Sequence, residues 1–143
     1  MQPLSPALEL SRAYSPVGNI RKLFALREYD GEILLSGPAG TGKTLGNLSL
    51  LWYYATQYDG MRGLIVRKTR ESMTESVLNT WEKRVVPVGH PCLLGAQRAN
   101  RSLYRIGNSE IVVGGMRASG KDMTQKIMST DFDVIVASEA IEF

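Results

Sequence analysis

Gly37-Pro38-Ala39-Gly40-Thr41-Gly42-Lys43-Thr44 is the stretch of the sequence that decides the fold. It matches G-x-x-x-x-G-K-[ST], a pattern in which a glycine-rich loop and the first turn of a helix surround a chain of phosphates. The apolar run Ile33-Leu34-Leu35 before it predicts a buried strand, and residues 45–58 after it predict a helix. Strand, glycine loop and helix in this order are the context that a P-loop requires.

The residues of this loop suit the binding of ATP and Mg²⁺. Glycines allow the tight bend that turns backbone N–H groups toward phosphates. Lys43 would reach the β- and γ-phosphates, and the Thr44 hydroxyl would ligate Mg²⁺. The predicted cofactor-binding residues are Gly37, Pro38, Ala39, Gly40, Thr41, Gly42, Lys43 and Thr44. The alternative is a glycine-rich turn of similar shape that binds nothing.

Composition describes an ordinary globular domain. The 143 residues are enough for one domain or for part of a larger one, with 43% hydrophobic and 22% charged residues. A single cysteine excludes an internal disulfide and favours a reducing compartment, and a single histidine leaves no His/Cys metal cluster. No apolar run approaches the roughly 20 residues that span a bilayer, and no secretory signal is present. The net charge of +3 permits a nucleic-acid partner without requiring one.

The order of elements predicts an α/β fold. Residues 1–18 are rich in proline and predict an extended N-terminal arm, and residues 19–143 predict a P-loop ATPase domain that opens with a short helix. Asp59-Gly60 ends the helix after the P-loop, and Gly63-Leu64-Ile65-Val66-Arg67 follows as a second buried strand. Two strands joined by a helix impose a parallel pairing with a right-handed crossover.

A second helix is predicted downstream by residues that recur at intervals of four: Met73, Val77, Trp81 and Val85. A capping box begins it at Ser72 and Pro87 ends it. Residues 89–101 then predict a loop, in which His90 is better explained as a loop histidine than as a metal ligand.

A hairpin and a basic loop complete the middle of the chain. Residues 102–106 and 110–113 predict two strands around the turn residues Gly107-Asn108-Ser109. Residues 114–125 predict a loop that carries glycines and the cations Arg117 and Lys121, with Lys126 nearby.

The last apolar run predicts the second half of a nucleotide site. ATPases of this class place a metal-holding Asp and a water-activating Glu after a buried strand, in the Walker B pattern. Val134-Ile135-Val136-Ala137-Ser138-Glu139 has this pattern with serine at the Asp position. Glu139 is the predicted catalytic carboxylate, and Ser138 could hydrogen-bond a metal-bound water without supplying a charge. The alternative is a strand that ends at a solvated glutamate.

With these residues in hand, the chain resembles the ATPase domain of the large terminase subunit, the DNA-packaging motor of tailed phages. Four features in order carry the resemblance, which covers roughly residues 20–143: the P-loop, the strand and helix from Leu64 to Val77, the hairpin with its Gly/Arg loop at 114–121, and residues 129–142. The resemblance implies an ASCE-type P-loop NTPase, a mainly parallel sheet flanked by helices, acting in the cytoplasm of a bacterial host. It also implies a ring of subunits that meets double-stranded DNA, a portal protein and a small terminase subunit.

One departure from the family concerns the arginine finger. Many terminases carry an arginine inside the P-loop, whereas residues 38–41 contain none, so this P-loop is closer to those of AAA+ ATPases and helicases. Arg117 is the expected catalytic arginine, delivered to a neighbouring subunit, with Lys121 and Lys126 as alternatives. The opposing interpretation is a surface loop with solvated charges. Arg67 and Arg70 could likewise face nucleotide or DNA phosphates.

A second departure concerns the C-terminus. The usual strand order of this class, 5-1-4-3-2, places a further strand between the P-loop strand and the Walker B strand, and that strand would have to follow Phe143. We therefore expect an ATPase domain incomplete at the C-terminus, with the remainder and any nuclease domain lying beyond it. Uncovered strand edges predict poor solubility for this chain alone.

Three functions stay open on the sequence. The first is an ATP-hydrolysing motor domain that drives double-stranded DNA into a procapsid, contacting the phosphate backbone without sequence preference. The second is another P-loop ATPase, AAA+ or helicase-like, that acts on a different polymer. The third is a nucleotide-binding fragment without turnover, which the serine at position 138 favours.

Overall fold

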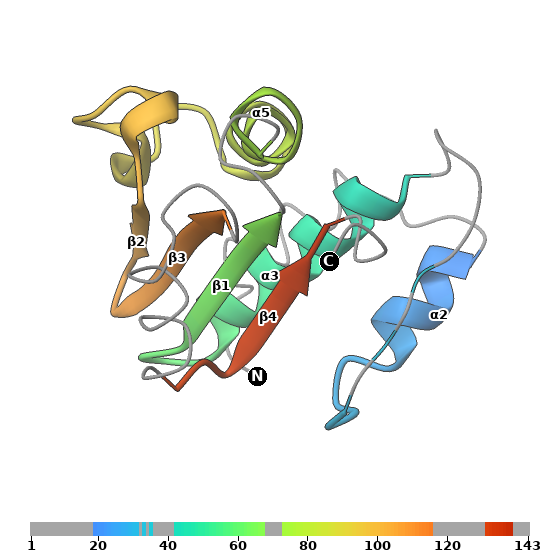
Figure 1. Ribbon diagram of the computed structural model, residues 1–143. Coiled ribbons are helices and arrows are strands. Elements are labelled where there is room, and N and C mark those ends of the chain that lie inside the picture. The colour runs from blue at the N-terminus through green and yellow to red at the C-terminus, as the bar shows by residue number, and fades with distance from the viewer. Residues whose placement is uncertain are drawn as a thin grey trace.

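The computed structural model describes residues 19–31, 33, 35, 42–67, 73–115 and 131–138. These residues form an open four-stranded sheet with helices packed beside it, in the strand order β2-β3-β1-β4 (Figure 1). The predicted α/β class and mainly parallel sheet are confirmed to this extent. The predicted N-terminal arm, 1–18, lies outside the described residues.

Strand β1, Arg62–Arg67, is the centre of the sheet. It pairs in parallel with β3, Ser109–Gly115, on one side and with β4, Val134–Ala137, on the other. Five of its six residues are buried, as expected for a continuous apolar run covered on both faces. The strand predicted at residues 63–67 is therefore confirmed.

The hairpin is formed by β2, Leu103–Ile106, and β3, which pair antiparallel. Its turn is shorter than predicted, because Ser109 already belongs to β3 and leaves Gly107 and Asn108 to make the bend. Gly107 has φ +61°, a conformation that glycine adopts at little cost. The Ser109 hydroxyl donates to the Tyr58 carbonyl at 3.0 Å, which ties the hairpin to the end of α3.

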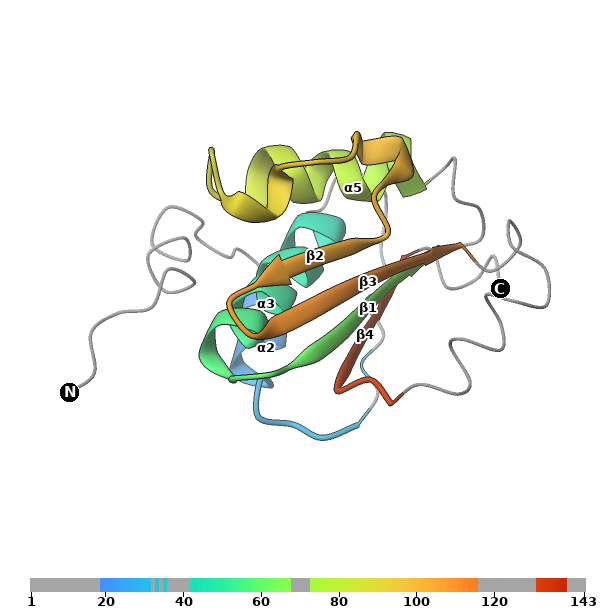
Figure 2. The same cartoon turned by 90° about the vertical axis from the view of Figure 1, so that its left-hand side faces the viewer.

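Helix α3, Lys43–Gln57, packs against the sheet, and α2, Asn19–Ala25, packs against α3 (Figure 2). A methyl group at Gly46 would come within 2.8 Å of Ile20, so glycine permits the close approach of the two helices. The helix predicted at 45–58 is confirmed, and Gly60, at φ +71°, lies in the turn after it.

The helix predicted from intervals of four spans Met73–Val85, but its turns are wider than expected. A π-helical turn, Met73–Val77, leads into α5, Leu78–Thr80, and a second π-helical turn, Trp81–Val85, follows. A strict interval of four exceeds the 3.6 residues of an α-helical turn, and the wider π turn keeps such residues on one face. Val77, Trp81 and Val85 are all fully buried.

The core lies between α3, the Met73–Val85 helix and the hairpin. Two aromatic edge-to-face contacts mark its middle: Trp52 and Trp81 have ring centroids 6.1 Å apart, and Trp81 and Tyr104 are 6.0 Å apart. Such pairs contribute about 0.5–1.5 kcal/mol beyond their burial. The core is therefore centred on the β2–β3 side of the molecule, with Val134 and Val136 of β4 packed against its margin.

One predicted strand is not found among the described residues. Ile33 and Leu35 belong to no strand, and Leu34 lies outside the described part of the chain. The physical reason is pairing, because an apolar run becomes a strand only when a neighbour completes its hydrogen-bond ladder. Within the described residues β4 pairs on one edge only, with β1, and offers no partner to Ile33 or Leu35.

Candidate functional site

The end of the P-loop is described from Gly42 onward, and its geometry fits the motif. Gly42 precedes α3 with φ 82° and ψ 15°, in the left-handed region, which glycine occupies at far lower cost than any residue with a Cβ. The Gly46 N–H donates to the Gly42 carbonyl at 2.9 Å, so the helical ladder starts directly after the glycine. The preceding loop residues, 37–41, lie outside the described part of the chain.

Lys43 and Thr44 are the first two residues of α3, and both are half-buried. The first N–H groups of a helix have no acceptor within the helix, and the helix dipole places partial positive charge beside them. In combination with the motif, these two residues present backbone donors, a cation and a hydroxyl at one place. This is the donor set that a phosphate chain with Mg²⁺ requires.

The start of α3 lies at the carboxyl end of the sheet. Residues 58–61 connect the end of α3 to the start of β1. A 15-residue helix is about 22 Å long, and a six-residue strand is about 20 Å long. Helix and strand run in opposite directions, so the first turn of α3 is level with the last residues of β1, as Figure 1 shows.

Ser138 lies at the same end of the sheet. It follows β4 directly, is half-buried, and donates its N–H to the Val66 carbonyl at 3.0 Å. Arg67, the last residue of β1, is 9% exposed at this end too. Open parallel sheets bind ligands beyond the carboxyl ends of their strands. Lys43, Thr44, Ser138 and Arg67 are thus gathered at the end of the sheet where a ligand is expected.

Other predicted site residues lie outside the described part of the chain. These are Glu139, Arg117, Lys121, Lys126 and Arg70. Their roles as carboxylate, finger and phosphate contacts stay predictions. Among the described residues no group of three or more His, Cys, Asp and Glu side chains could hold a metal ion.

His90 has a structural role that explains its position. Its Nδ1 accepts the Cys92 N–H at 3.0 Å and caps the short 3-10 turn Pro91–Leu93. Burial lowers the pKa of His90, which favours the neutral ring that can accept this hydrogen bond. Burial raises the pKa of the Cys92 thiol to about 11, so the sulfur stays protonated at neutral pH.

Sequence reasoning missed a buried ionic cluster, formed by Glu82, Arg101 and Tyr104. The Arg101 guanidinium donates to Glu82 Oε2 at 2.7 Å and to the Leu93 carbonyl at 2.7 Å, and the Tyr104 hydroxyl donates to the same carboxylate oxygen. Burial raises the pKa of Tyr104, which keeps that hydroxyl protonated. The cluster anchors the 89–101 loop to the helix and the hairpin. No sequence signal distinguishes Glu82 from the solvated acids of a helix.

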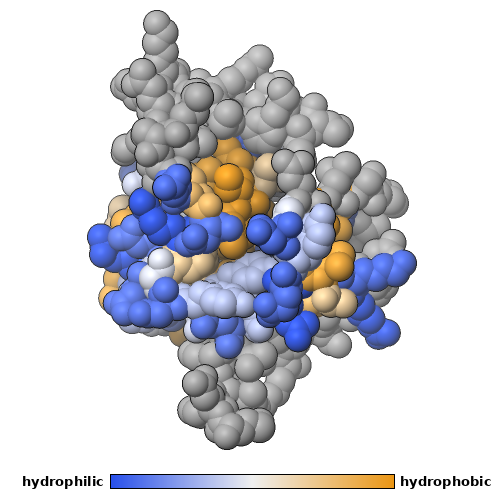
Figure 3. Space-filling model, turned by 90° about the horizontal axis from the view of Figure 1, so that it is seen from below, coloured by the Kyte–Doolittle hydropathy of each residue, from blue (hydrophilic) through white to orange (hydrophobic). Residues whose placement is uncertain are grey.

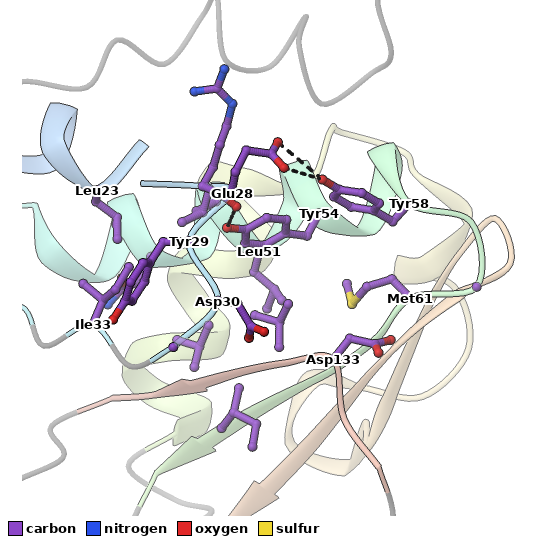
Figure 4. Close-up of a pocket in the computed structure, with 18 of the residues that line it drawn as sticks. Leu23, Glu28, Tyr29, Asp30, Ile33, Leu51, Tyr54, Tyr58, Met61 and Asp133 are labelled. Carbon is purple, nitrogen blue, oxygen red and sulfur yellow. Dashed lines mark hydrogen bonds between the residues drawn. The ribbon is translucent and has the colours of Figure 1, made fainter. Parts of the chain in front are cut away.

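Two cavities among the described residues have linings that do not include Lys43, Thr44 or Ser138. The larger cavity, of about 600 Å³, lies between α3 and β4 (Figure 4). On the α3 side its lining extends from Asn47 to Tyr58, and on the β4 side it includes residues 133–136. The smaller, of about 340 Å³, lies between Trp52, His90 and the hairpin turn.

No family model, curated protein or solved structure matches the chain. Among the described residues, no helix is both long enough and apolar enough to cross a membrane.

Proposed function

We propose that this chain is a P-loop NTPase domain that binds and hydrolyses ATP, and that it powers DNA packaging in the manner of a large terminase subunit. The observation that carries the nucleotide site is the left-handed Gly42 at the start of α3. It delivers Lys43 and Thr44 to the carboxyl end of the sheet, the end where β4 stops at Ser138. The assignment to DNA packaging is supported by the sequence resemblance alone.

In this proposal each residue has one task. The α3 N-terminus and Lys43 bind and orient the phosphates, and Thr44 supplies the protein's hydroxyl ligand to Mg²⁺. Glu139 orients the attacking water, and Arg117 of a neighbouring subunit offsets the charge that develops on the transferred group. Bound Mg²⁺ would neutralise charge on the phosphate oxygens.

The strand arrangement supports the choice of an ASCE-type sheet. In that class the Walker B strand lies beside the strand that follows the P-loop helix. Here β4 lies beside β1, the strand that follows α3. β4 also pairs with β1 alone among the described residues, in keeping with a strand order that separates it from the P-loop strand.

Nucleotide-dependent stabilisation of the chain tests the site. Mg-ATP at 100 times its dissociation constant should add about 2.7 kcal/mol to the free energy of unfolding, seen as a raised melting temperature. Lys43→Ala should abolish this shift, whereas the matched control Lys83→Ala, at an exposed lysine of the Met73–Val85 helix, should retain it. An equal shift in both variants would exclude a P-loop site.

A nucleotide-binding module without turnover is the second candidate, and Ser138 is the observation that favours it. Its N–H is bound to Val66, and its side chain carries no charge for a metal-bound water. Phosphate release, measured with and without double-stranded DNA, separates the functions. Release that DNA stimulates and that Glu139→Gln abolishes supports the motor, and DNA-independent release supports another ATPase. Binding without release supports the module.

A further inference from the structure

Arg67, the last residue of β1, stands on the face of the sheet that helix α3 covers. A Cβ added at Gly63 would lie 3.0 Å from Leu51 of α3, so Gly63 faces that helix. Alternate residues of a strand point to the same face, which places Ile65 and Arg67 on the side of α3 as well. In agreement, Ile65 belongs to the same core cluster as Leu51.

Ser138 lies on the same face, beside the neighbouring strand. Val136, the register partner of Ile65, packs against the core, and Ser138 follows it by two residues. The Ser138 N–H donates to the Val66 carbonyl at 3.0 Å, so the hydrogen bonding between β4 and β1 extends to this position. Neighbouring strands lie about 4.8 Å apart. Arg67 and Ser138 are therefore side by side at the carboxyl end of the sheet, level with the first turn of α3.

The Arg67 side chain brings a buried positive charge to this end. Only 9% of the residue is exposed, and a guanidinium this buried needs acceptor groups around it. Arg67 interacts within the chain, and its five N–H donors allow it to bind a further group at the same time. The first turn of α3 adds the helix dipole and Lys43 but no acidic residue. Two elements therefore supply positive charge to the predicted nucleotide site.

The arginine at the other end of β1 has a different environment. The Arg62 side chain is 44% exposed and lies 3.8 Å from Glu110, and its guanidinium carbon lies 5.7 Å from the ring centroid of Phe132. Hydrophilic side chains gather on the described part of this end, where β1 and β4 begin (Figure 3). Of these two arginines, only Arg67 is buried beside the predicted nucleotide site.

We propose that Arg67 binds the terminal phosphate of the nucleotide from within the same chain, and so lets a single chain distinguish a nucleoside triphosphate from a diphosphate. The inference rests on the proposed function, because it requires the P-loop site. The terminal phosphate is favoured because Ser138 occupies the Walker B position, next to which the transferred phosphate and its metal lie. The planar guanidinium matches phosphate oxygens with two parallel hydrogen bonds. This role is distinct from that of Arg117, which the proposed function takes from a neighbouring subunit.

Isothermal titration calorimetry of the full chain with two magnesium nucleotides tests this role. The probes are Mg-ADP and the magnesium complex of a non-hydrolysable ATP analogue with a β,γ-imido bridge. Wild type should bind the analogue more tightly than Mg-ADP. Arg67→Gln should weaken binding of the analogue about ten- to hundredfold, as expected for lost hydrogen bonds to a charged group, and change the affinity for Mg-ADP by less than about twofold.

Arg62→Gln is the matched control, because Arg62 lies on the same strand at the opposite end; both affinities should stay unchanged. A purely structural role of Arg67 would weaken both nucleotides equally, and this result would overturn the proposal, as would no weakening at all. If circular dichroism shows that Arg67→Gln does not fold, Arg67→Lys replaces it. That variant keeps the charge but not the planar fork, so binding of the analogue alone should weaken about three- to tenfold. Equal effects on both nucleotides in this variant, or none, would again overturn the proposal.

Lys43→Ala separates a failure of this inference from a failure of the P-loop site. The site stands and only the inference falls if Lys43→Ala abolishes binding of both nucleotides while the Arg67 variants bind both as wild type does. A wild-type chain that binds neither nucleotide would refute both.

Discussion

Strands β1 and β4 are parallel neighbours of similar apolar character, yet only β1 is buried. On the side of β1 that faces β2 and β3, α3 and the Met73–Val85 helix close a core around Trp52, Trp81 and Tyr104. On the side of β4, the larger cavity borders the strand, and Val134 and Val136 are half-buried while Ile135 is exposed. Apolar sequence alone therefore does not decide burial; neighbouring elements do. The stability of the described fold should be concentrated on the hairpin side.

The largest effect is expected at the buried ionic cluster. Arg101→Met would leave the Glu82 carboxylate, whose side chain is 11% exposed, without its closest cation. Breaking a buried pair by removing one partner costs about 3–5 kcal/mol of unfolding free energy, and because Arg98 stays 3.5 Å from the other Glu82 oxygen, the loss should fall at the lower end, about 3 kcal/mol. Chemical denaturation followed by tryptophan fluorescence would measure the loss.

Arg105→Met is the matched control on the adjacent hairpin strand. Its side chain is 71% exposed and lies 3.5 Å from Glu110, so its loss should change stability by no more than about 0.5 kcal/mol. Similar effects of the two substitutions would mean that the buried cluster does not stabilise the hairpin side.

Substituting Leu64 and Ile135, which are register partners in β1 and β4, tests directly whether β1 is more deeply buried than β4. Leu64→Ala in β1 should destabilise the chain by about 2–5 kcal/mol, because it leaves a cavity in a fully packed site. Ile135→Ala, at the partner position in β4, should cost less than about 1 kcal/mol, since more than half of that side chain is already exposed. Urea denaturation of both variants would measure the difference. Equal losses would show that β4 is as well buried in solution as β1.

Local sequence chemistry predicted most of the described elements. Apolar runs located β1 and β4, Gly107 and Asn108 located the hairpin turn, and intervals of four located the Met73–Val85 helix. These signals work because the spacing of buried residues along an element and the conformation of a turn are both set by residues close together in the sequence. The same intervals of four are longer than the 3.6 residues of an α-helical turn, so they also indicated the wider π-helical turns.

What the sequence did not yield depends on distant partners. Glu82 meets Arg101 and Tyr104 across 19 and 22 residues, and nothing near Glu82 indicates burial. Ile33 and Leu35 have strand composition, but a strand also needs a paired neighbour. At the candidate site, the motifs predicted the helix after the P-loop and the strand before Glu139, although α3 begins at Lys43, two residues before the predicted start, and β4 ends at Ala137. Residues 37–41, Arg117 and Glu139 lie outside the described part of the chain, so their roles rest on the sequence.

An effect confined to alkaline pH is expected at Cys92, on the well-packed side. Its thiol is 8% exposed, and burial raises its pKa from 9.0 to about 11. The folded chain therefore keeps the proton at a pH where the unfolded chain releases it, and proton release favours unfolding. Below about pH 8 the thiol contributes almost no pH dependence, and from about pH 8 to 11 the free energy of unfolding should fall as pH rises. Cys92→Ala should remove this part of the decline, so the stability difference between wild type and variant should narrow over that range.

Alkylation by iodoacetamide gives an independent measurement of the same thiol. Only the thiolate reacts appreciably, so Cys92 in the folded chain should be modified far more slowly at pH 8 than in the chain unfolded by urea. The control is a small thiol peptide under both conditions, which corrects for any effect of urea on the reagent. Rapid modification of the folded chain would show that Cys92 is accessible to the reagent. The β2–β3 side would then not be tightly packed around this residue.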